Sequence, residues 1–144
     1  MLIEISSLIT PEIYEAIYRM GHLDELVIAD ANYSALNMSK KVIYSQVQEN
    51  HTLLSEIIKY FPLDEDVEFP VTVMSLDHGF MEEPQIWQDY QRVLAKLPSC
   101  KQTVLNKVSR REFYQRSKDA YATIQTLDPR VMGDIIIRKG FVFI

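Results

Sequence analysis

The 144-residue chain has few of the residues on which several protein classes depend. Its one cysteine, Cys100, excludes an intramolecular disulfide and any zinc site built from several cysteines, and fits a reducing compartment. Its four glycines form no glycine-rich phosphate loop, and the sequence has no GxSxG and no HExxH motif. The usual sequence signatures of phosphoryl transfer and acyl transfer are therefore missing.

Long hydrophobic runs and an excess of positive charge are also absent. No apolar run approaches the roughly 20 residues of a membrane-spanning helix. The amino terminus, MLIEISSLIT, has no basic stretch before its apolar residues, so we expect a cytoplasmic protein without a membrane partner. Fifteen Lys and Arg against 20 Asp and Glu give a net charge of -5, and the basic residues form only short pairs. This charge argues against a nucleic-acid partner.

The composition is that of an ordinary globular protein. Apolar residues make up 47% of the chain and charged residues 24%, and no Pro/Gly/Ser-rich tract or repeat marks a boundary. A chain of this length buries roughly 68–70% of its unfolded surface. We therefore expect residues 1–144 to form a single domain.

The first predicted helix has recognisable ends. Thr10 can cap it, Pro11 suits its first position, and Glu12 favours the positive end of the helix dipole. Apolar residues at helical spacing follow over 13–20. We expect Gly21 to end this helix in the left-handed conformation.

Further helices and strands alternate along the chain. Helices are predicted from the apolar spacing at 53–61 and 86–97, ended by Pro62 and Pro98, and from a capping-box pattern that begins at Ser109. Buried strands are predicted at 26–29 and 70–76, and further strands or strand-like segments at 42–44, 103–105, 122–126, 134–138 and 141–144. This alternation predicts an α/β sandwich with a mixed or largely parallel sheet flanked by helices.

The carboxyl-terminal segment 141–144, Phe-Val-Phe-Ile, carries no charged side chain. A free tail of this composition would expose a run of large apolar side chains to water. We expect it to be buried in the sheet or in a subunit contact, which suggests a homo-oligomer.

The chain has three histidines in different contexts. His51 and His78 are expected to be solvated or to cap helices. His22 follows the first helix, where it could bond the last helix carbonyls. Because imidazole exchanges a proton near neutrality, His22 could equally act as a general acid or base.

Asp30 follows the predicted strand 26–29, at the end where ligands bind in open α/β sheets. It is open whether Asp30 forms a turn or contacts a ligand. His22, Asp24 and Asp30 match no standard metal-ligand spacing, so we expect no metal site.

The stretch MGHLDELVIADAN at 20–32 resembles the MGHGDEIVxAD segment of the RbsD/FucU family, the ribose pyranases and L-fucose mutarotases. The likeness runs from end to end of the chain, with further matching blocks at 8–12, 32–35, 63–64, 112–116, 133 and 135–140. The sequence is more similar to the fucose branch, through Phe113-Tyr114-Gln115-Arg116 and Arg138-Lys139-Gly140.

This resemblance implies an RbsD-like fold and an isomerase. The enzyme would interconvert the α and β anomers of a free monosaccharide, L-fucose above all, with no cofactor and no metal. It implies a ring-shaped homodecamer with sites near subunit contacts. The family's catalytic histidine falls on His22, its sugar-binding aspartate on Asp30 and an arginine on Arg110.

The sequence departs from the family at the sugar-binding Tyr-Gly-Asn, which falls on Met132, Gly133 and Asp134. Met132 has no hydroxyl, and a carboxylate at Asp134 only accepts hydrogen bonds. The second proton-transfer partner beside His22 could be water, Asp134 or a tyrosine such as Tyr33. A sugar-binding protein without catalysis and a purely structural oligomer are the competing hypotheses.

Overall fold

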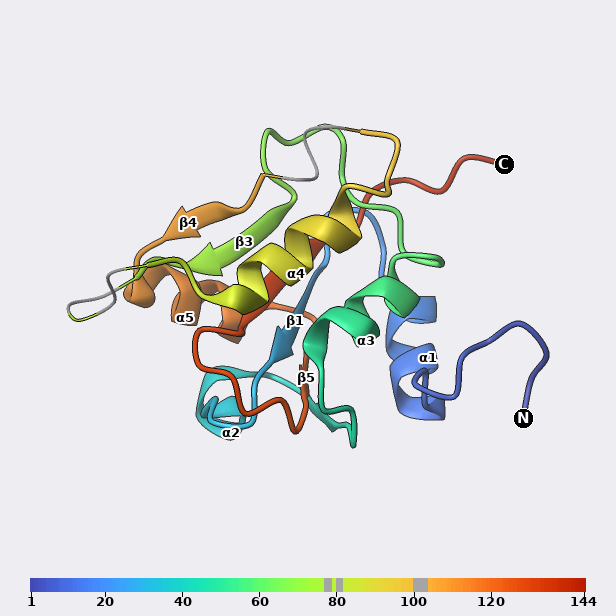
Figure 1. Cartoon of the computed structure of the whole chain (residues 1–144). Coiled ribbons are helices and arrows are strands. Elements are labelled where there is room, and N and C mark those ends of the chain that lie inside the picture. The colour runs from blue at the N-terminus through green and yellow to red at the C-terminus, as the bar shows by residue number, and fades with distance from the viewer. Residues whose placement is uncertain (77–78, 80–81, 100–103) are drawn as a thin grey trace.

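The computed structural model describes residues 1–76, 79, 82–99 and 104–144. His78 lies outside these residues, so its expected role stays a prediction. Within them the chain forms a six-stranded sheet with strand order β2-β5-β1-β6-β3-β4 (Figure 1). The strands are β1 (Glu25–Ala29), β2 (Val42–Tyr44), β3 (Val71–Met74), β4 (Asn106–Val108), β5 (Ala122–Gln125) and β6 (Ile135–Arg138). The helices are α1 (Pro11–Arg19), α2 (Ala35–Met38), α3 (Asn50–Ile57), α4 (Gln85–Leu94) and α5 (Arg110–Asp119).

The sheet is mixed because strand β6 is reversed. β1 pairs in parallel with β5, and β5 with β2, whereas β6 is antiparallel to both β1 and β3, and β3 is parallel to β4. The carboxyl ends of five strands and the amino end of β6 therefore lie at one edge of the sheet, which we call the Asp30 edge. The opposite edge, which holds His22 and the chain after β6, we call the His22 edge.

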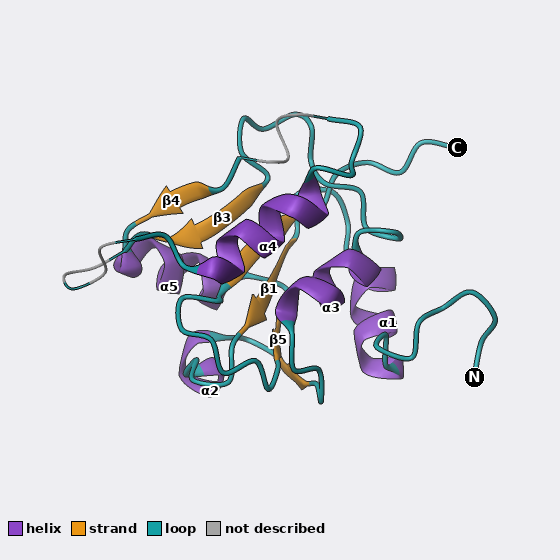
Figure 2. Ribbon diagram, viewed as in Figure 1, coloured by secondary structure: helices purple, strands orange, loops and turns teal. Residues whose placement is uncertain are grey.

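Helices cover both faces of the sheet, which confirms the predicted sandwich (Figure 2). Along β6, Ile135 and Ile137 face a large apolar cluster with α1, α3 and α4, while Ile136 faces a smaller cluster that includes Phe113 of α5. This alternation follows from the two-residue period of a strand. Because both faces are covered, the central strands are almost continuously apolar.

Helix α1 begins as predicted and ends differently. The Thr10 Oγ1 accepts a hydrogen bond from the Ile13 N–H, with Pro11 in the first turn. The helix ends at Arg19, and the positive φ of this loop, 77°, belongs to Leu23. The prediction that Gly21 ends the helix in the left-handed conformation is therefore wrong.

The strand expected at 103–105 begins later. Thr103 lies outside the described residues, and the strand that pairs with β3 is β4, at 106–108. Ser109 then caps α5, its Oγ accepting the Glu112 N–H at 3.1 Å, as predicted. The short helix α2 was not predicted.

The carboxyl-terminal tail is not a strand. After Arg138 the chain leaves the sheet and ends away from it (Figure 1). Residues 141–144 are exposed, Phe143 to 89%. Burial of this tail in the sheet is therefore wrong for the single chain, while burial in a subunit contact stays a prediction. Among the described residues, no helix combines the length and apolar character needed to cross a membrane.

Candidate functional site

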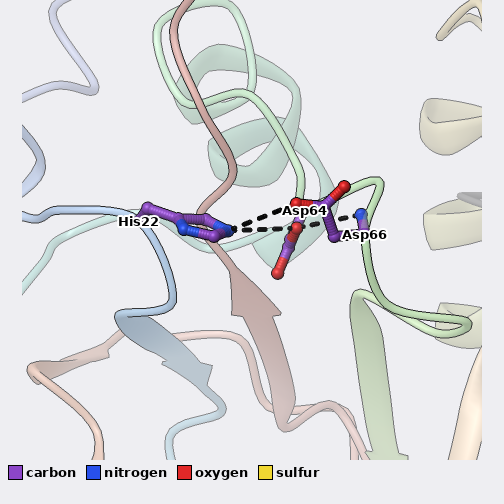
Figure 3. A group of neighbouring side chains, drawn as sticks. All are labelled: His22, Asp64 and Asp66. Atoms are coloured by element: carbon purple, nitrogen blue, oxygen red, sulfur yellow. Dashed lines mark hydrogen bonds and ion pairs between the residues drawn. The ribbon is translucent and has the colours of Figure 1, made fainter.

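His22 lies in the loop between α1 and β1, at the His22 edge. Its ring stacks on Phe141, with 3.8 Å between the ring centroids. Its Nε2 points to the carboxylates of Asp64 and Asp66, 3.4 Å from Asp64 Oδ1 and 3.9 Å from Asp66 Oδ2 (Figure 3). The His22 side chain is 25% exposed and that of Asp64 only 1%. A partly exposed imidazole, whose Nε2 is itself buried and makes no hydrogen bond with the described residues, thus stands in front of a buried carboxylate.

Asp64 is held in place by the chain that follows β6. The Asp64 N–H donates to the Arg138 carbonyl at 3.0 Å, and the Arg138 Nε lies 3.2 Å from Asp64 Oδ2. A Cβ at Gly140 would lie 2.7 Å from the Leu63 carbonyl oxygen, so only glycine allows this close approach. The Asp64 carboxylate therefore has a guanidinium on one side and the imidazole on the other.

Lys139 bonds the end of helix α1. Its buried ammonium group donates to the carbonyls of Ile17 and Met20. The contacts described for His22 are instead with Asp64, Asp66 and Phe141. A groove of about 700 Å³, lined by 58–66, 97–98 and 141–143, runs beside these contacts.

Three side chains at the His22 edge could hold a cation. One ligand atom each of His22, Asp64 and Asp66 lies within 4.8 Å of the other two. The metal-ligand set considered from the sequence, His22, Asp24 and Asp30, does not come together in the structure. Asp24 accepts the Gly21 N–H at 2.8 Å, and Asp30 lies at the other edge of the sheet. The guanidinium of Arg138 already balances part of the charge on Asp64.

Asp30 and Asp134 form a second cluster at the Asp30 edge, where antiparallel β1 and β6 meet. The Asn32 N–H donates to Asp30 Oδ1 at 2.8 Å, which closes an Asx turn, and the Gly133 N–H donates to Asp30 Oδ2 at 3.3 Å. In return the Asp30 N–H donates to Asp134 Oδ1 at 2.9 Å. The exposed fractions are only 3% for Asp30 and 9% for Asp134.

Both carboxyl groups hold a proton more tightly than free aspartate does. Burial raises the pKa of Asp134 well above its usual value, and the charge of Asp30 raises it further. Burial also raises the pKa of Asp30, although backbone hydrogen bonds from Asn32 and Gly133 oppose it. Two neighbouring buried carboxylates repel, so the ionisation of one group makes the ionisation of the other less favourable.

The loop 127–133 that carries Met132 and Gly133 is tied to helices α3 and α4. Arg130 donates to Asp128 Oδ2 and to Asp89 Oδ2, each at 2.7 Å. Burial alone would raise the pKa of Asp128, but the hydrogen bonds from Arg130 outweigh it and hold that pKa below its usual value. Asp128 therefore stays ionised and the loop stays anchored.

Side chains of α3 and α4 also hold the backbone at 132–133. The Gly133 carbonyl accepts hydrogen bonds from Asn50 Nδ2 and from the Tyr90 hydroxyl, and the Trp87 Nε1 donates to the Met132 carbonyl at 2.9 Å. A Cβ on Gly133 would lie 3.3 Å from Asp30 Cβ, so glycine lets the loop lie against Asp30. Met132 has a φ of 62°, and its side chain packs on the core.

Arg110 lies at the Asp30 edge. It is the exposed first residue of α5, directly after β4 and Ser109.

The structure thus divides the site residues predicted from the sequence. Asp30, Met132, Gly133 and Asp134 lie together, with Arg110 at the same edge. His22 lies at the opposite edge, because β1 (Glu25–Ala29) runs between it and Asp30. At roughly 3.3 Å per residue this strand separates them by on the order of 15 Å, far more than the width of a monosaccharide.

The chain was compared with known protein families and curated sequences. Residues 3–142 match the profile of the RbsD / FucU transport protein family. The chain belongs to the RbsD / FucU family. It is similar to the fucose mutarotase of Mus musculus, with 36% identity over 142 residues that cover 94% of this chain and 92% of the relative. The predicted resemblance is therefore confirmed.

Solved structures agree with this membership. The fucose mutarotase of Streptococcus pneumoniae, crystallised in complex with L-fucose, superimposes with a TM-score of 0.92 at 32% identity, covering 99% of this chain and 100% of that one. Bacillus subtilis RbsD, solved with D-ribose, has a TM-score of 0.72 at 17% identity, covering 96% of this chain and 98% of that one. The second comparison shows a shared fold.

Within this RbsD/FucU domain, two groups were missed as site residues. Asp64 faces His22 but lies 42 positions away, and the pairing of Leu63 with Lys139 brings it there. Tyr33, mentioned only as an alternative, has a buried hydroxyl without a hydrogen-bond partner among the described residues. Burial raises its pKa, and Asp134 and Asp30 raise it further.

Proposed function

We propose that this chain is a sugar mutarotase that interconverts the α and β anomers of a free reducing monosaccharide, with L-fucose as the preferred substrate. The observation that carries the proposal is the partly exposed His22 imidazole set against the buried Asp64 carboxylate, with Nε2 3.4 Å from Asp64 Oδ1. The similarity over nearly the whole chain to proteins named fucose mutarotases supports it.

The reaction needs two proton transfers. Protonated His22 donates its proton to the ring oxygen as the bond from that oxygen to the anomeric carbon breaks. A base takes the proton of the anomeric hydroxyl, and the carbonyl of the open sugar forms. The aldehyde end rotates, and the same steps run backwards to give the other anomer. Positioned proton transfer is typically worth about 10²–10⁴-fold in rate.

The proposed site is shared by two chains. His22 and Asp30 lie at opposite edges of one sheet, so one sugar reaches both only where the His22 edge of one subunit meets the Asp30 edge of a neighbour. Such a head-to-tail contact generates a closed ring when its rotation closes. We propose that the chain forms the ring-shaped homodecamer implied by the resemblance, with Asp30, Arg110, Met132, Gly133 and Asp134 orienting the sugar.

Proton NMR exchange spectroscopy tests the activity directly. The anomeric signals of equilibrated L-fucose are recorded with and without the protein. We expect strong exchange cross-peaks only with the protein, and their loss in His22→Ala, with Asp119→Asn on the exposed end of α5 as the control. Full exchange by His22→Ala would contradict the role of His22. D-ribose and D-galactose, tested in the same way, rank the sugars.

Mixed oligomers test the shared site. His22→Ala and Asp30→Ala chains are each expected to be inactive, but when they are co-expressed with different tags, about a quarter of the sites contain two intact edges. Recovery of about that fraction of the wild-type exchange rate is expected from oligomers purified on both tags. A site within one chain predicts no recovery at all.

A sugar-binding protein without catalysis is the second candidate. It is favoured by Met132 and Asp134, which stand where the resemblance places a tyrosine and an asparagine. It predicts saturable shifts of the sugar signals with no exchange cross-peaks for any sugar tested. A purely structural oligomer predicts neither shifts nor exchange.

A further inference from the structure

One histidine and two aspartates converge on a single point at the His22 edge (Figure 3). The Nε2 of His22 lies 3.4 Å from Asp64 Oδ1 and 3.9 Å from Asp66 Oδ2. Nitrogen and oxygen ligands bound to a tetrahedral ion at about 2.0–2.2 Å lie roughly 3.4 Å from one another. The three side chains are therefore spaced nearly as a tetrahedral metal ion would hold them.

The polar atoms around this point lack partners despite their burial. His22 Nε2 and Asp64 Oδ2 are buried and make no hydrogen bond with the described residues, although Oδ2 lies 3.2 Å from the Arg138 Nε. The Asp64 side chain is only 1% exposed. Buried polar atoms nearly always have a partner, and an exception calls for an explanation such as a bound ion. A cation between His22 and Asp64 would give the imidazole nitrogen its missing partner.

A turn fixes the two carboxylates beside each other. The Asp66 N–H donates to Asp64 Oδ1 at 3.0 Å, which closes an Asx turn. The pairing of Leu63 with Lys139 and the guanidinium of Arg138 hold Asp64 from the other side. The Asp66 side chain is 71% exposed, so the cluster opens to solvent on its side. The ligand atoms are thus placed in advance, and an ion has a path of entry.

The donor atoms decide which kind of ion fits. One imidazole nitrogen with two carboxylate oxygens suits a first-row transition ion such as Zn²⁺, whereas Mg²⁺ and Ca²⁺ prefer oxygen ligands alone. Zinc sites with three protein ligands keep a fourth position for water. Two carboxylates and the Arg138 guanidinium sum to one negative charge beside the imidazole, which favours a divalent cation.

We propose that His22, Asp64 and Asp66 bind one Zn²⁺ or a similar divalent transition ion, and that this ion reversibly inhibits the enzyme. The inhibition rests on the proposed function. Histidine binds a metal ion only in its neutral form, so the ion takes the Nε2 lone pair that a proton occupies in the imidazolium. A metal-bound His22 therefore has no proton to give to the ring oxygen.

Calorimetric titration of untagged, chelator-treated protein with Zn²⁺ tests the site itself. We expect one ion per chain, with no competition from Mg²⁺ or Ca²⁺. Asp66→Ala removes one ligand and should weaken binding by at least about 10- to 100-fold, the loss that even outer partners of a metal ligand cause. Glu65→Ala removes the same charge from the adjacent exposed residue, outside the set of three, and should bind like wild type.

A spectroscopic readout is independent of activity. Co²⁺ takes the place of Zn²⁺ in such sites and absorbs visible light strongly when its ligands are tetrahedral. We expect this absorption in wild type and in Glu65→Ala. It should be lost in His22→Ala and in Asp66→Ala, because each variant lacks one of the three ligands.

Exchange spectroscopy on L-fucose tests the inhibition. Saturating Zn²⁺ should remove the exchange cross-peaks of wild type and of Glu65→Ala, and EDTA should restore them. Asp66→Ala should exchange the sugar without metal and keep doing so at the Zn²⁺ concentration that inhibits wild type. This variant separates the metal site from the proton chemistry, because Asp66 is needed only for the metal.

Each contrary result overturns a stated part of the proposal. Absence of saturable Zn²⁺ binding, or equal binding by Asp66→Ala, would overturn the site. Zn²⁺ bound at these residues with no loss of exchange would overturn the inhibition. If wild type exchanges no sugar at all, the proposed function fails and the inhibition with it, while calorimetry and the Co²⁺ spectrum still decide whether the site exists.

Discussion

At the scale of single residues, the clearest pairing is that of His22 with Asp64. A buried carboxylate 3.4 Å from Nε2, itself braced by Arg138, fixes the position of the imidazole relative to the surface. A buried carboxylate beside a catalytic histidine can orient its ring. Asp64 is therefore expected to be a positioning residue.

Asp64→Asn tests this expectation. We expect the anomer exchange rate to fall about 10- to 100-fold while the dissociation constant for the sugar changes little, because the amide removes the negative charge beside the imidazole. NMR exchange rates and shift titrations measure the two quantities. Asp66→Asn is the comparison, and its loss should be smaller because Asp66 is 71% exposed and 3.9 Å away. Equal losses in both variants would contradict the special role of Asp64.

Local residue roles were predictable, and distant ones were not. Thr10, Ser109 and the turn at Asp30 follow from sequence neighbours within three positions. We predicted the left-handed residue after α1 at Gly21, but the structure has it at Leu23. Glycine adopts this conformation more readily than other residues, but the preference is statistical and tertiary contacts override it. The approach of Asp64 to His22 depends on the chain after β6 and has no local signal.

At the scale of elements, loop 127–133 depends on one guanidinium. Arg130 bridges Asp128 at the start of the loop to Asp89 of α4. Asp128 is fully buried and also accepts the Asn50 N–H at 2.8 Å. The position of Met132 and Gly133 beside Asp30 therefore rests on an ion pair whose carboxylate is buried and whose guanidinium is partly exposed.

Arg130→Gln should destabilise the protein by about 2–4 kcal/mol at pH 7, because it leaves Asp128 ionised and unpaired. The pKa of Asp128 is lowered by folding from its ordinary 3.8, so this contribution is present above pH 4 and lost as the pH falls through the folded value. The difference in unfolding free energy from wild type should therefore shrink at pH 3. Urea unfolding at both pH values measures it, and an equal difference at both would contradict the ion pair's role.

Elements with strong periodic patterns were predicted well. β2 was predicted at its observed bounds, and β3 and α4 were placed with ends a few residues too long. The four-residue α2 was missed because it is short and Ser34 makes no side-chain cap. The tail 141–144 reads as a strand from its apolar residues alone, and only pairing partners decide otherwise.

At the scale of the whole molecule, the proposed site residues form two groups, one at the His22 edge and one at the Asp30 edge, on opposite edges of the sheet. The sequence could name their members, but not that β1 would hold them apart, since this depends on the strand order. The exposed tail lies at the His22 edge, where Phe141 stacks on His22 and Phe143 packs against Phe141 at 5.9 Å between centroids. A subunit contact at the His22 edge would cover the exposed apolar tail 141–144.

Phe143→Ser should therefore weaken the assembly. Sedimentation velocity is expected to show smaller species at micromolar concentration, and exchange activity should fall with them because each proposed site needs two chains. Phe143→Tyr, which keeps most of the apolar area, is the matched control. Wild-type assembly and activity in Phe143→Ser would exclude the tail from the contact.

The reversed strand β6 is the last strand along the chain, yet it lies between β1 and β3 in the middle of the sheet. During synthesis, the parallel groups β2-β5-β1 and β3-β4 therefore emerge before the strand that joins them. Until then each group has an open edge able to pair with another chain. Folding of the sheet has to wait for residues 135–138, and a chain that stops before them would hold two unjoined half-sheets prone to aggregation.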